Sequence, residues 1–335
     1  MTELAAIFGL QGPSLSAAEK AFFRDANPWA FILFARNIET PDQVKNLTNS
    51  LRDTVGRECL IFIDQEGGRV QRLRSPHWYD YPSLGSIGSL YEMDREKTRR
   101  TVFLHHCMIA ADLREVGINA NCAPVLDIPI EGADPIISDR ALGATSRQVL
   151  DLGQAALAGL MTAGVAPVIK HIPGHGRATV DSHLELPIIQ DSILKLASTD
   201  FVPFIGMQEA PMAMTAHLIV EALDRDNPVT VSPRAISYIR EKMGYSGLLM
   251  SDDLDMKALS GNLTELTRKT LKAGCDVVLQ CSGKFPSMVE VAKGARILDE
   301  LGRMRAKIAE YCAEDPRDFD YEAGMAEYES LIFRE

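Results

Sequence analysis

The chemically richest segment of this 335-residue chain is residues 168–187, which read VIKHIPGHGRATVDSHLELP. The segment begins as a short apolar strand that ends in Lys170 and His171, and it continues into a loop with two glycines that closes on Asp181 and His183. Ionisable side chains at the C-terminal end of a strand, followed by such a loop, are typical of a catalytic lid. A surface loop that carries histidines by chance is the alternative. Three of the chain's seven histidines lie in this segment, which favours the catalytic interpretation.

Polar and ionisable side chains also follow most of the other apolar runs in the chain. They are Asp64 to Arg69 in the segment DQEGGR, Asp127, His217, Ser251 to Asp253, and Gln280. If the runs are the strands of a parallel barrel, all these side chains point into one C-terminal mouth, where the active sites of that fold lie. Chance placement would scatter charges over both ends of the strands. The pattern therefore supports a barrel and an enzyme together.

The motifs of several other enzyme classes are missing from the sequence. There is no GxGxxG, P-loop or GxSxG motif, and no CxxC or HExxH metal motif, so we expect no cofactor and no metal. A carboxylate with a separate proton donor fits glycoside hydrolysis, in which an anion meets an oxocarbenium-like centre while the leaving oxygen is protonated. Asp64, Arg140, Lys170 and His171 would then hold sugar hydroxyls through charged hydrogen bonds.

Eight apolar runs of strand length alternate with helical patterns, and this alternation must position those side chains. The runs lie at 5–10, 30–34, 60–63, 118–124, 167–169, 212–215, 248–250 and 276–279. The helical patterns lie at 40–55, 95–116, 146–163, 232–243 and 263–273, and most are followed by the glycine expected where a helix leads into a strand. This pattern favours an α/β fold of the (β/α)8 TIM-barrel type over an open doubly wound sheet.

We predict one domain over residues 1–335, because no linker or internal repeat interrupts the pattern. The interval 74–90 is predicted to be a long loop. A helical C-terminal tail is predicted from about residue 288, with a terminal helix at 288–311 and a turn at 315–320; the last residues would wrap around the barrel.

Composition limits the partners and the location. The net charge of −11 disfavours nucleic acid and anionic lipid, and the longest apolar runs are far too short to span a membrane. The N-terminus lacks the basic start of a signal peptide, and the six scattered cysteines have no paired spacing. We therefore expect a reduced, cytoplasmic protein that acts as a monomer on a small substrate, without nucleic-acid or membrane partners.

The loop segment and GLLMSDDLDM resemble the signature segments of glycoside hydrolase family 3, in particular its bacterial β-N-acetylglucosaminidases of the NagZ type. Further similar segments, in the same order, are IFIDQEGGRVQRL, INANCAPVLDI, SDRALG, TAHLIV and AGCDVVL. The resemblance spans about residues 5–300, and its most specific part is the pattern Lys-His-x-Pro-Gly-His-Gly followed by Asp-Ser-His.

The resemblance implies a role for each matching residue. Asp252 is the catalytic nucleophile, His183 the general acid/base and Asp181 its partner, while Asp64, Arg72, Arg140, Lys170 and His171 bind the sugar. Enzymes of this type are retaining and remove a terminal β-linked N-acetylglucosamine, and their cytosolic members act on muropeptides during peptidoglycan recycling. The loop at 173–182 is also predicted to be mobile, because Gly174 and Gly176 supply backbone freedom and a lid must admit a sugar and then exclude water.

Two alternative functions and the role of His217 remain open at this point. A phosphorylase or transglycosylase of the same family would use the same residues, and a non-catalytic sugar-binding protein would not need Asp252, Asp181 and His183. His217 is as compatible with a hydrogen-bonded core histidine as with a substrate contact. For His105 and His106, which lie within a helical pattern, a structural role is favoured.

Overall fold

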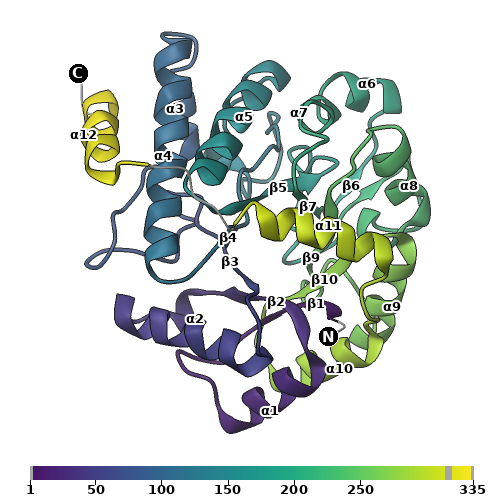
Figure 1. Cartoon of the computed structure of the whole chain (residues 1–335). Coiled ribbons are helices and arrows are strands. Elements are labelled where there is room, and N and C mark those ends of the chain that lie inside the picture. The colour runs from purple at the N-terminus through teal and green to yellow at the C-terminus, as the bar shows by residue number, and fades with distance from the viewer. Residues whose placement is uncertain (1–2, 314–318, 333–335) are drawn as a thin grey trace.

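The computed structural model describes residues 3–313 and 319–332. In this part of the chain, eight parallel strands close into a barrel surrounded by helices, which confirms the predicted TIM barrel (Figure 1). The strands follow the order β1-β10-β9-β7-β5-β4-β3-β2. Their bounds are β1 Leu4–Gly9, β2 Pro28–Leu33, β3 Leu60–Ile63, β4 Ala120–Asn121, β5 Ala166–Ile172, β7 Met212–Thr215, β9 Leu248–Asp253 and β10 Val277–Gln280. A separate small sheet pairs β6 Ile188–Ile189 with β8 Ile219–Val220.

Two strands extend further than the apolar runs predicted. β5 continues through Lys170 and His171, because backbone pairing with β7 persists to Ile172. β9 likewise includes Asp252 and Asp253. In both strands, the backbone pairing continues past the last residue of the apolar run. The final residues are therefore held by the sheet while their side chains face the mouth. In the opposite direction, the run at 118–124 contributes only β4 Ala120–Asn121 as regular strand.

The helices follow the predicted alternation, with additions. They are α1 Ala17–Ala26, α2 Pro41–Val55, α3 Leu84–Gly88, α4 Arg95–Glu115, α5 Ser146–Thr162, α6 Ile193–Ser198, α7 Phe201–Gly206, α8 Pro233–Glu241, α9 Leu263–Ala273, α10 Phe285–Gly294, α11 Glu300–Tyr311 and α12 Tyr321–Ile332. Short 3-10 turns are η1 Ala35–Asn37, η2 Ser138–Arg140 and η3 Val229–Val231. The predicted long loop at 74–90 therefore contains one short helix, α3, whose first turn is capped by Ser83.

The tail differs from the single helix predicted at 288–311. It divides into α10 and α11, because the segment between them pairs with the start of β1: the backbone of Ala5 donates to Arg296, and that of Leu298 donates to Glu3. Asp299 then caps α11 by accepting from the Gly302 N–H. The turn predicted at 315–320 lies mostly outside the described residues. α12 packs against α4 at the edge of the ring of helices (Figure 1), and the wrapping of the barrel by the last residues stays a prediction.

One end of the barrel is covered and the other carries the chemistry. α11 crosses the end of the barrel where the strands begin (Figure 1), and Arg305 on this helix binds Asp276 and the carbonyl of Ser246, which precede β10 and β9. The polar strand ends therefore gather at the opposite mouth. None of the described helices combines the length and the apolar character needed to cross a membrane.

Candidate active site

A cavity of about 500 Å3 lies at the C-terminal mouth of the barrel. Its lining includes all but one of the predicted site residues: Asp64, Arg72, Arg140, Lys170, His171, His183 and Asp252. The remaining residue, Asp181, is hydrogen-bonded to His183. The fold thus brings together residues from β3, β5, β9 and their loops that lie up to 188 positions apart in the sequence, as the strand-end pattern predicted.

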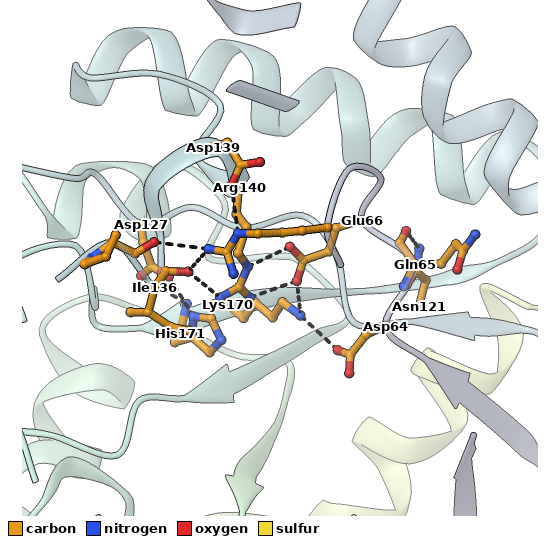
Figure 2. A network of polar contacts seen from close by, with 12 residues as sticks. Asp64, Gln65, Glu66, Asn121, Asp127, Ile136, Asp139, Arg140, Lys170 and His171 are labelled. Carbon is orange, nitrogen blue, oxygen red and sulfur yellow. Dashed lines mark hydrogen bonds and ion pairs between the residues drawn. The ribbon is translucent and has the colours of Figure 1, made fainter. Parts of the chain in front are cut away.

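A cluster of charged side chains, each paired with a partner of opposite charge, forms one wall of the cavity (Figure 2). The Lys170 ammonium lies 3.0 Å from Asp64 Oδ1 and 2.6 Å from Glu66 Oε1. Arg140 donates two hydrogen bonds of 2.9 Å to the two oxygens of Glu66, the bidentate geometry that guanidinium groups favour. Arg72 donates to Asp64 Oδ2 at 3.1 Å. Three cations are therefore held by two carboxylates.

The charges in this cluster outweigh the effect of burial. Burial alone would raise the pKa of Asp64, but Lys170 and Arg72 hold that pKa well below its ordinary value. Burial is likewise opposed at Glu66, where Arg140 and Lys170 lower the pKa to about 2. For Lys170, burial would lower the pKa, but Asp64 and Glu66 raise it. All these groups are charged at neutral pH, so they can offer strong hydrogen bonds to a polar ligand.

The buried carboxylate of Asp127 contacts two neighbouring histidines, His171 and His175. Its Oδ2 lies 2.6 Å from His171 Nδ1, and its Oδ1 accepts from the backbone N–H groups of His175 at 2.6 Å and His171 at 3.2 Å. Burial opposes ionisation of this carboxyl, yet the contacts from His171 and His175 keep its pKa low. The His171 ring is thereby oriented by an ionised carboxylate, which leaves its Nε2 for the cavity side.

The two neighbouring carboxyls at the end of β9 have opposite electrostatic environments. Burial would raise the pKa of Asp252, but His217, His171 and a hydrogen bond from the Asp253 N–H hold it below its ordinary value. Burial instead dominates at Asp253 and raises its pKa to about 7, even though its Oδ1 accepts from the N–H groups of Cys281 and Asp255. Of these two carboxyls, Asp252 is therefore the one whose ionised form is favoured.

His217 lies beneath this pair with both ring nitrogens engaged. Nδ1 lies 2.7 Å from Thr230 Oγ1, and Nε2 lies 3.0 Å from the Asp253 carbonyl oxygen. The side chain is fully buried, which lowers its pKa. These contacts favour the core role for His217 over substrate contact. His105 is also structural, since its ring meets the Tyr328 hydroxyl at 2.7 Å and the Glu66 carbonyl at 3.2 Å.

Asp181 and His183 form a hydrogen-bonded pair at the rim of the cavity. Asp181 Oδ1 lies 2.7 Å from His183 Nδ1 and accepts from the His183 backbone N–H at 2.8 Å. Burial would raise the pKa of Asp181, but these contacts with His183 lower it. An Asp two residues before a His can reach this geometry only in a tight turn, which the N–H groups of Leu184 and Glu185 close by donating to the Asp181 carbonyl. The other imidazole nitrogen, Nε2, is left without a role in the pair.

Comparison with known proteins agrees with the geometry of the site. Residues 5–308 match the glycosyl hydrolase family 3 N terminal domain. The chain belongs to glycoside hydrolase family 3. A β-hexosaminidase from Alkalilimnicola ehrlichii is 37% identical over 281 residues, which cover 82% of this chain and 80% of the relative. One from Methylococcus capsulatus is 35% identical over 98% of this chain and 97% of its own length.

A solved structure of native NagZ from Neisseria gonorrhoeae has the same fold, with a TM-score of 0.88 and 28% identity over 99% of this chain and 98% of that one. These likenesses confirm the family resemblance and the enzyme class predicted from the sequence. This family 3 member is thus a glycoside hydrolase of the β-N-acetylhexosaminidase type.

The loop after β5, which its two glycines predict to be mobile, makes several contacts with the rest of the protein in its first half. Arg177 binds Asp200 at 2.7 Å, and the carbonyls of Gly176 and Ala178 accept from the backbone of the facing loop at 128–134. A Cβ on Gly176 would lie only 1.9 Å from the Ile128 carbonyl oxygen, so this close approach requires glycine. The contacts confine any large movement to the residues after Ala178.

Sequence reasoning missed several residues of this family 3 site. Glu66 and Asp127 were noted only as strand-end residues, and His175 and Ser182 only as parts of the loop motif. The sequence signal for Glu66 was its place in the charged segment DQEGGR directly after β3. Asp127 and His175 gave no comparable signal, because their contacts depend on loop packing.

Proposed function

We propose that this chain is a retaining, exo-acting β-N-acetylglucosaminidase with Asp252 as nucleophile and His183 as general acid/base. An ionised Asp252 oxygen attacks the anomeric carbon, the glycosidic C–O bond breaks, and the proton on His183 Nε2 moves to the departing oxygen. A water oxygen then attacks the anomeric carbon, its proton returns to His183 Nε2, and Asp252 is released as the carboxylate.

The observation that carries this proposal is that Asp252 and the Asp181-bound His183 line the same cavity. Asp181 orients the imidazole through Nδ1 and stabilises its protonated form, which leaves Nε2 for proton transfer. An imidazole can both give and take a proton near neutral pH, so it suits both steps. Nucleophile and proton donor are both side chains of this chain, and the proposed steps call for no metal or cofactor.

The charged wall supports a sugar as the substrate. Asp64, Arg140 and Lys170 present ionised groups that suit the hydroxyls of a terminal sugar, with Arg72 and His171 beside them. One relative, NagZ from Neisseria gonorrhoeae, was solved in complex with N-trifluoroacetyl-D-glucosamine, and its structure superposes on this chain with a TM-score of 0.88. We infer that the bound sugar is N-acetylglucosamine and that the natural substrates are muropeptides of cytoplasmic peptidoglycan recycling. We further propose that the enzyme acts as a monomer.

Turnover of an aryl β-N-acetylglucosaminide with identification of the first-formed anomer tests the proposal. We expect the β-anomer as the first product and, with a slow glycosylating sugar that traps the intermediate, a covalent label on Asp252. An α-anomer, or a label on Asp253, would contradict the assignment.

Phosphorolysis is a second candidate, because the proposed acid/base is an imidazole. A neutral imidazole repels an incoming phosphate less than a carboxylate would. The two reactions are separated by their products: phosphorolysis yields a sugar 1-phosphate when phosphate is present, whereas hydrolysis yields free sugar whether or not phosphate is added.

A further inference from the structure

The second half of the β5 loop is attached to the rest of the protein through one residue. Every hydrogen bond that joins residues 179–186 to the other described parts of the chain involves Ser182. Its hydroxyl lies 3.0 Å from His175 Nε2, and its carbonyl accepts from the Ala258 N–H at 3.3 Å. Ser182 is only 4% exposed, although His183 beside it has a side chain that is 59% exposed. The attachment point therefore lies between Asp181 and His183.

His175 is a rigid partner for this serine. Its ring is 4% exposed and packs edge-on against His171, with 5.7 Å between the ring centroids, and its backbone N–H donates to Asp127. Nδ1 of the ring has no hydrogen-bond partner among the described residues, so Ser182 is the ring's polar contact. Burial lowers the pKa of His175 to about 4, although the Asp127 charge opposes this effect. The ring is therefore neutral at neutral pH and serves as a hydrogen-bonding group.

We propose that the His175–Ser182 hydrogen bond is a latch that positions the Asp181–His183 pair over the cavity, with both latch residues acting as positioning residues. The proposal rests on the acid/base role proposed above for His183. Asp127 accepts a hydrogen bond from the backbone N–H of His175 and contacts the ring of His171. One buried carboxylate therefore supports both the sugar-binding wall and the latch. With the latch formed, His183 is held near the departing oxygen. Without it, residues 179–186 lose their side-chain attachment and proton delivery becomes less frequent.

The latch predicts a defect that depends on the leaving group. In a retaining enzyme, kcat/KM reports the step in which the leaving group departs, and protonation matters most for a poor leaving group. Ser182→Ala should lower kcat/KM for a β-1,4-linked N-acetylglucosamine disaccharide roughly tenfold more than for a nitrophenyl glycoside, the size expected for one hydrogen bond. Thr179→Val is the matched control, because Thr179 is an exposed residue of the same segment and its hydroxyl makes no hydrogen bond to the described residues. This substitution should change kcat/KM for both substrates by the same factor.

Variants of His175 test whether the hydrogen bond itself is responsible. His175→Gln places an amide near the position of Nε2 and should retain most of the disaccharide activity, whereas the shorter His175→Asn should not. The Ser182→Ala and His175→Asn double variant should be no worse than the worse single variant, because both remove the same contact. If His175→Asn fails to fold, a comparison of Ser182→Ala with Ser182→Thr still tests the hydrogen bond. Thr keeps the hydroxyl, so Ser182→Thr should restore the ratio of the kcat/KM values for the two substrates.

Failure of the latch can be distinguished from failure of the proposed function. If His183→Ala shows no greater loss on the disaccharide than on the nitrophenyl glycoside, the acid/base role itself is wrong. If His183→Ala shows that difference but Ser182→Ala affects both substrates equally, or neither, the latch is overturned while the acid/base role stands. Fully additive losses in the double variant would also overturn the latch.

Discussion

The two halves of the site are built in opposite ways. On the sugar-binding wall, the side chains of Lys170 and Glu66 are 3% and 1% exposed and carry several charged contacts each. On the loop, the side chains of His183 and Asp181 are 59% and 24% exposed and contact mainly each other. Strand ends and buried ion pairs hold the first half in place, whereas a short turn holds the second. The proposed sugar-binding groups are thus preorganised, while the proposed proton donor lies on the more adaptable segment.

This difference follows from what each half must do. A wall that recognises hydroxyls gains from fixed donors and acceptors, because no reorganisation is then needed on binding. A proton donor must stay clear while the sugar enters and then approach the glycosidic oxygen. Asp252 belongs to the fixed half although it is the proposed nucleophile, since it lies in the paired part of β9. The following predictions test the contrast, beginning with the largest effect.

Asp252→Ala should abolish turnover of every substrate, with a loss of at least about 10⁴-fold in kcat, because the covalent step has no other nucleophile. The fold should persist, since removal of a carboxylate that His217 and His171 stabilise leaves the barrel pairing in place. Steady-state kinetics and a circular dichroism melt check both points. Activity that remains within tenfold of the wild type would show that Asp252 is not the nucleophile.

Glu66→Gln should destabilise the fold by about 3–5 kcal/mol, the range for breaking a buried ion pair, because Arg140 and Lys170 lose a shared anion. Chemical denaturation measures the change. Glu185→Gln on the loop is the matched control, since Glu185 is exposed and should change stability by less than about 0.5 kcal/mol. Equal effects of the two substitutions would remove the distinction between a fixed and an adaptable half.

The same contrast explains what the sequence could predict. The barrel followed from the alternation of apolar runs and helices, and the mouth followed from the polar ends of those runs. The residues on the fixed half that were predicted, such as Asp64, Lys170 and Arg140, are all present at the cavity. Their role in holding a sugar was predicted from their charge and from the resemblance, and the roles of Asp181, His183 and Asp252 from the resemblance. All these roles stay predictions.

What the sequence could not supply are contacts made between distant loops. Glu66 binds Arg140 across 74 residues, and Asp127 reaches His175 across 48, with no periodicity to indicate either pair. The break between α10 and α11 has the same origin, since pairing of Arg296 with the start of β1 overrides local helical tendency. Local pattern determines elements, but the partners of loop residues depend on how those elements pack.

His183→Ala should lower kcat/KM for a disaccharide by roughly 10²–10³-fold, within the range for loss of a general acid. The loss on a nitrophenyl glycoside should be much smaller, because that leaving group departs without protonation. A comparison of the two substrates on one enzyme preparation makes the measurement. Equal losses would indicate that His183 holds the loop or the sugar rather than moving a proton.

Acid should lower the stability of the fold, because Glu66 in the fixed half becomes protonated. Its folded-state pKa of about 2 lies below the ordinary 4.5, so its contribution to stability is complete above pH 4.5 and is lost as the pH falls toward 2. The free energy of unfolding of the wild type should therefore fall in this window more steeply than that of Glu66→Gln, which has no carboxyl to titrate there. Denaturation at pH 5, 4 and 3 measures both slopes. Parallel slopes would mean that Glu66 is not held ionised by Arg140 and Lys170.

Asp181→Ala should give the smallest effect, a loss of roughly tenfold in kcat/KM for the disaccharide, because Asp181 orients and stabilises the imidazole but transfers no proton. The pattern should match His183→Ala in kind, with less loss on a nitrophenyl glycoside, since both substitutions weaken proton delivery. Asp181→Asn keeps an oxygen that can accept from His183 Nδ1 and should fall between the wild type and Asp181→Ala. Stability should change little, because the side chain of Asp181 makes its contacts within one short turn and its partner His183 is 59% exposed. A loss on both substrates alike would instead assign Asp181 to the folding of the turn, through its bond from the His183 N–H.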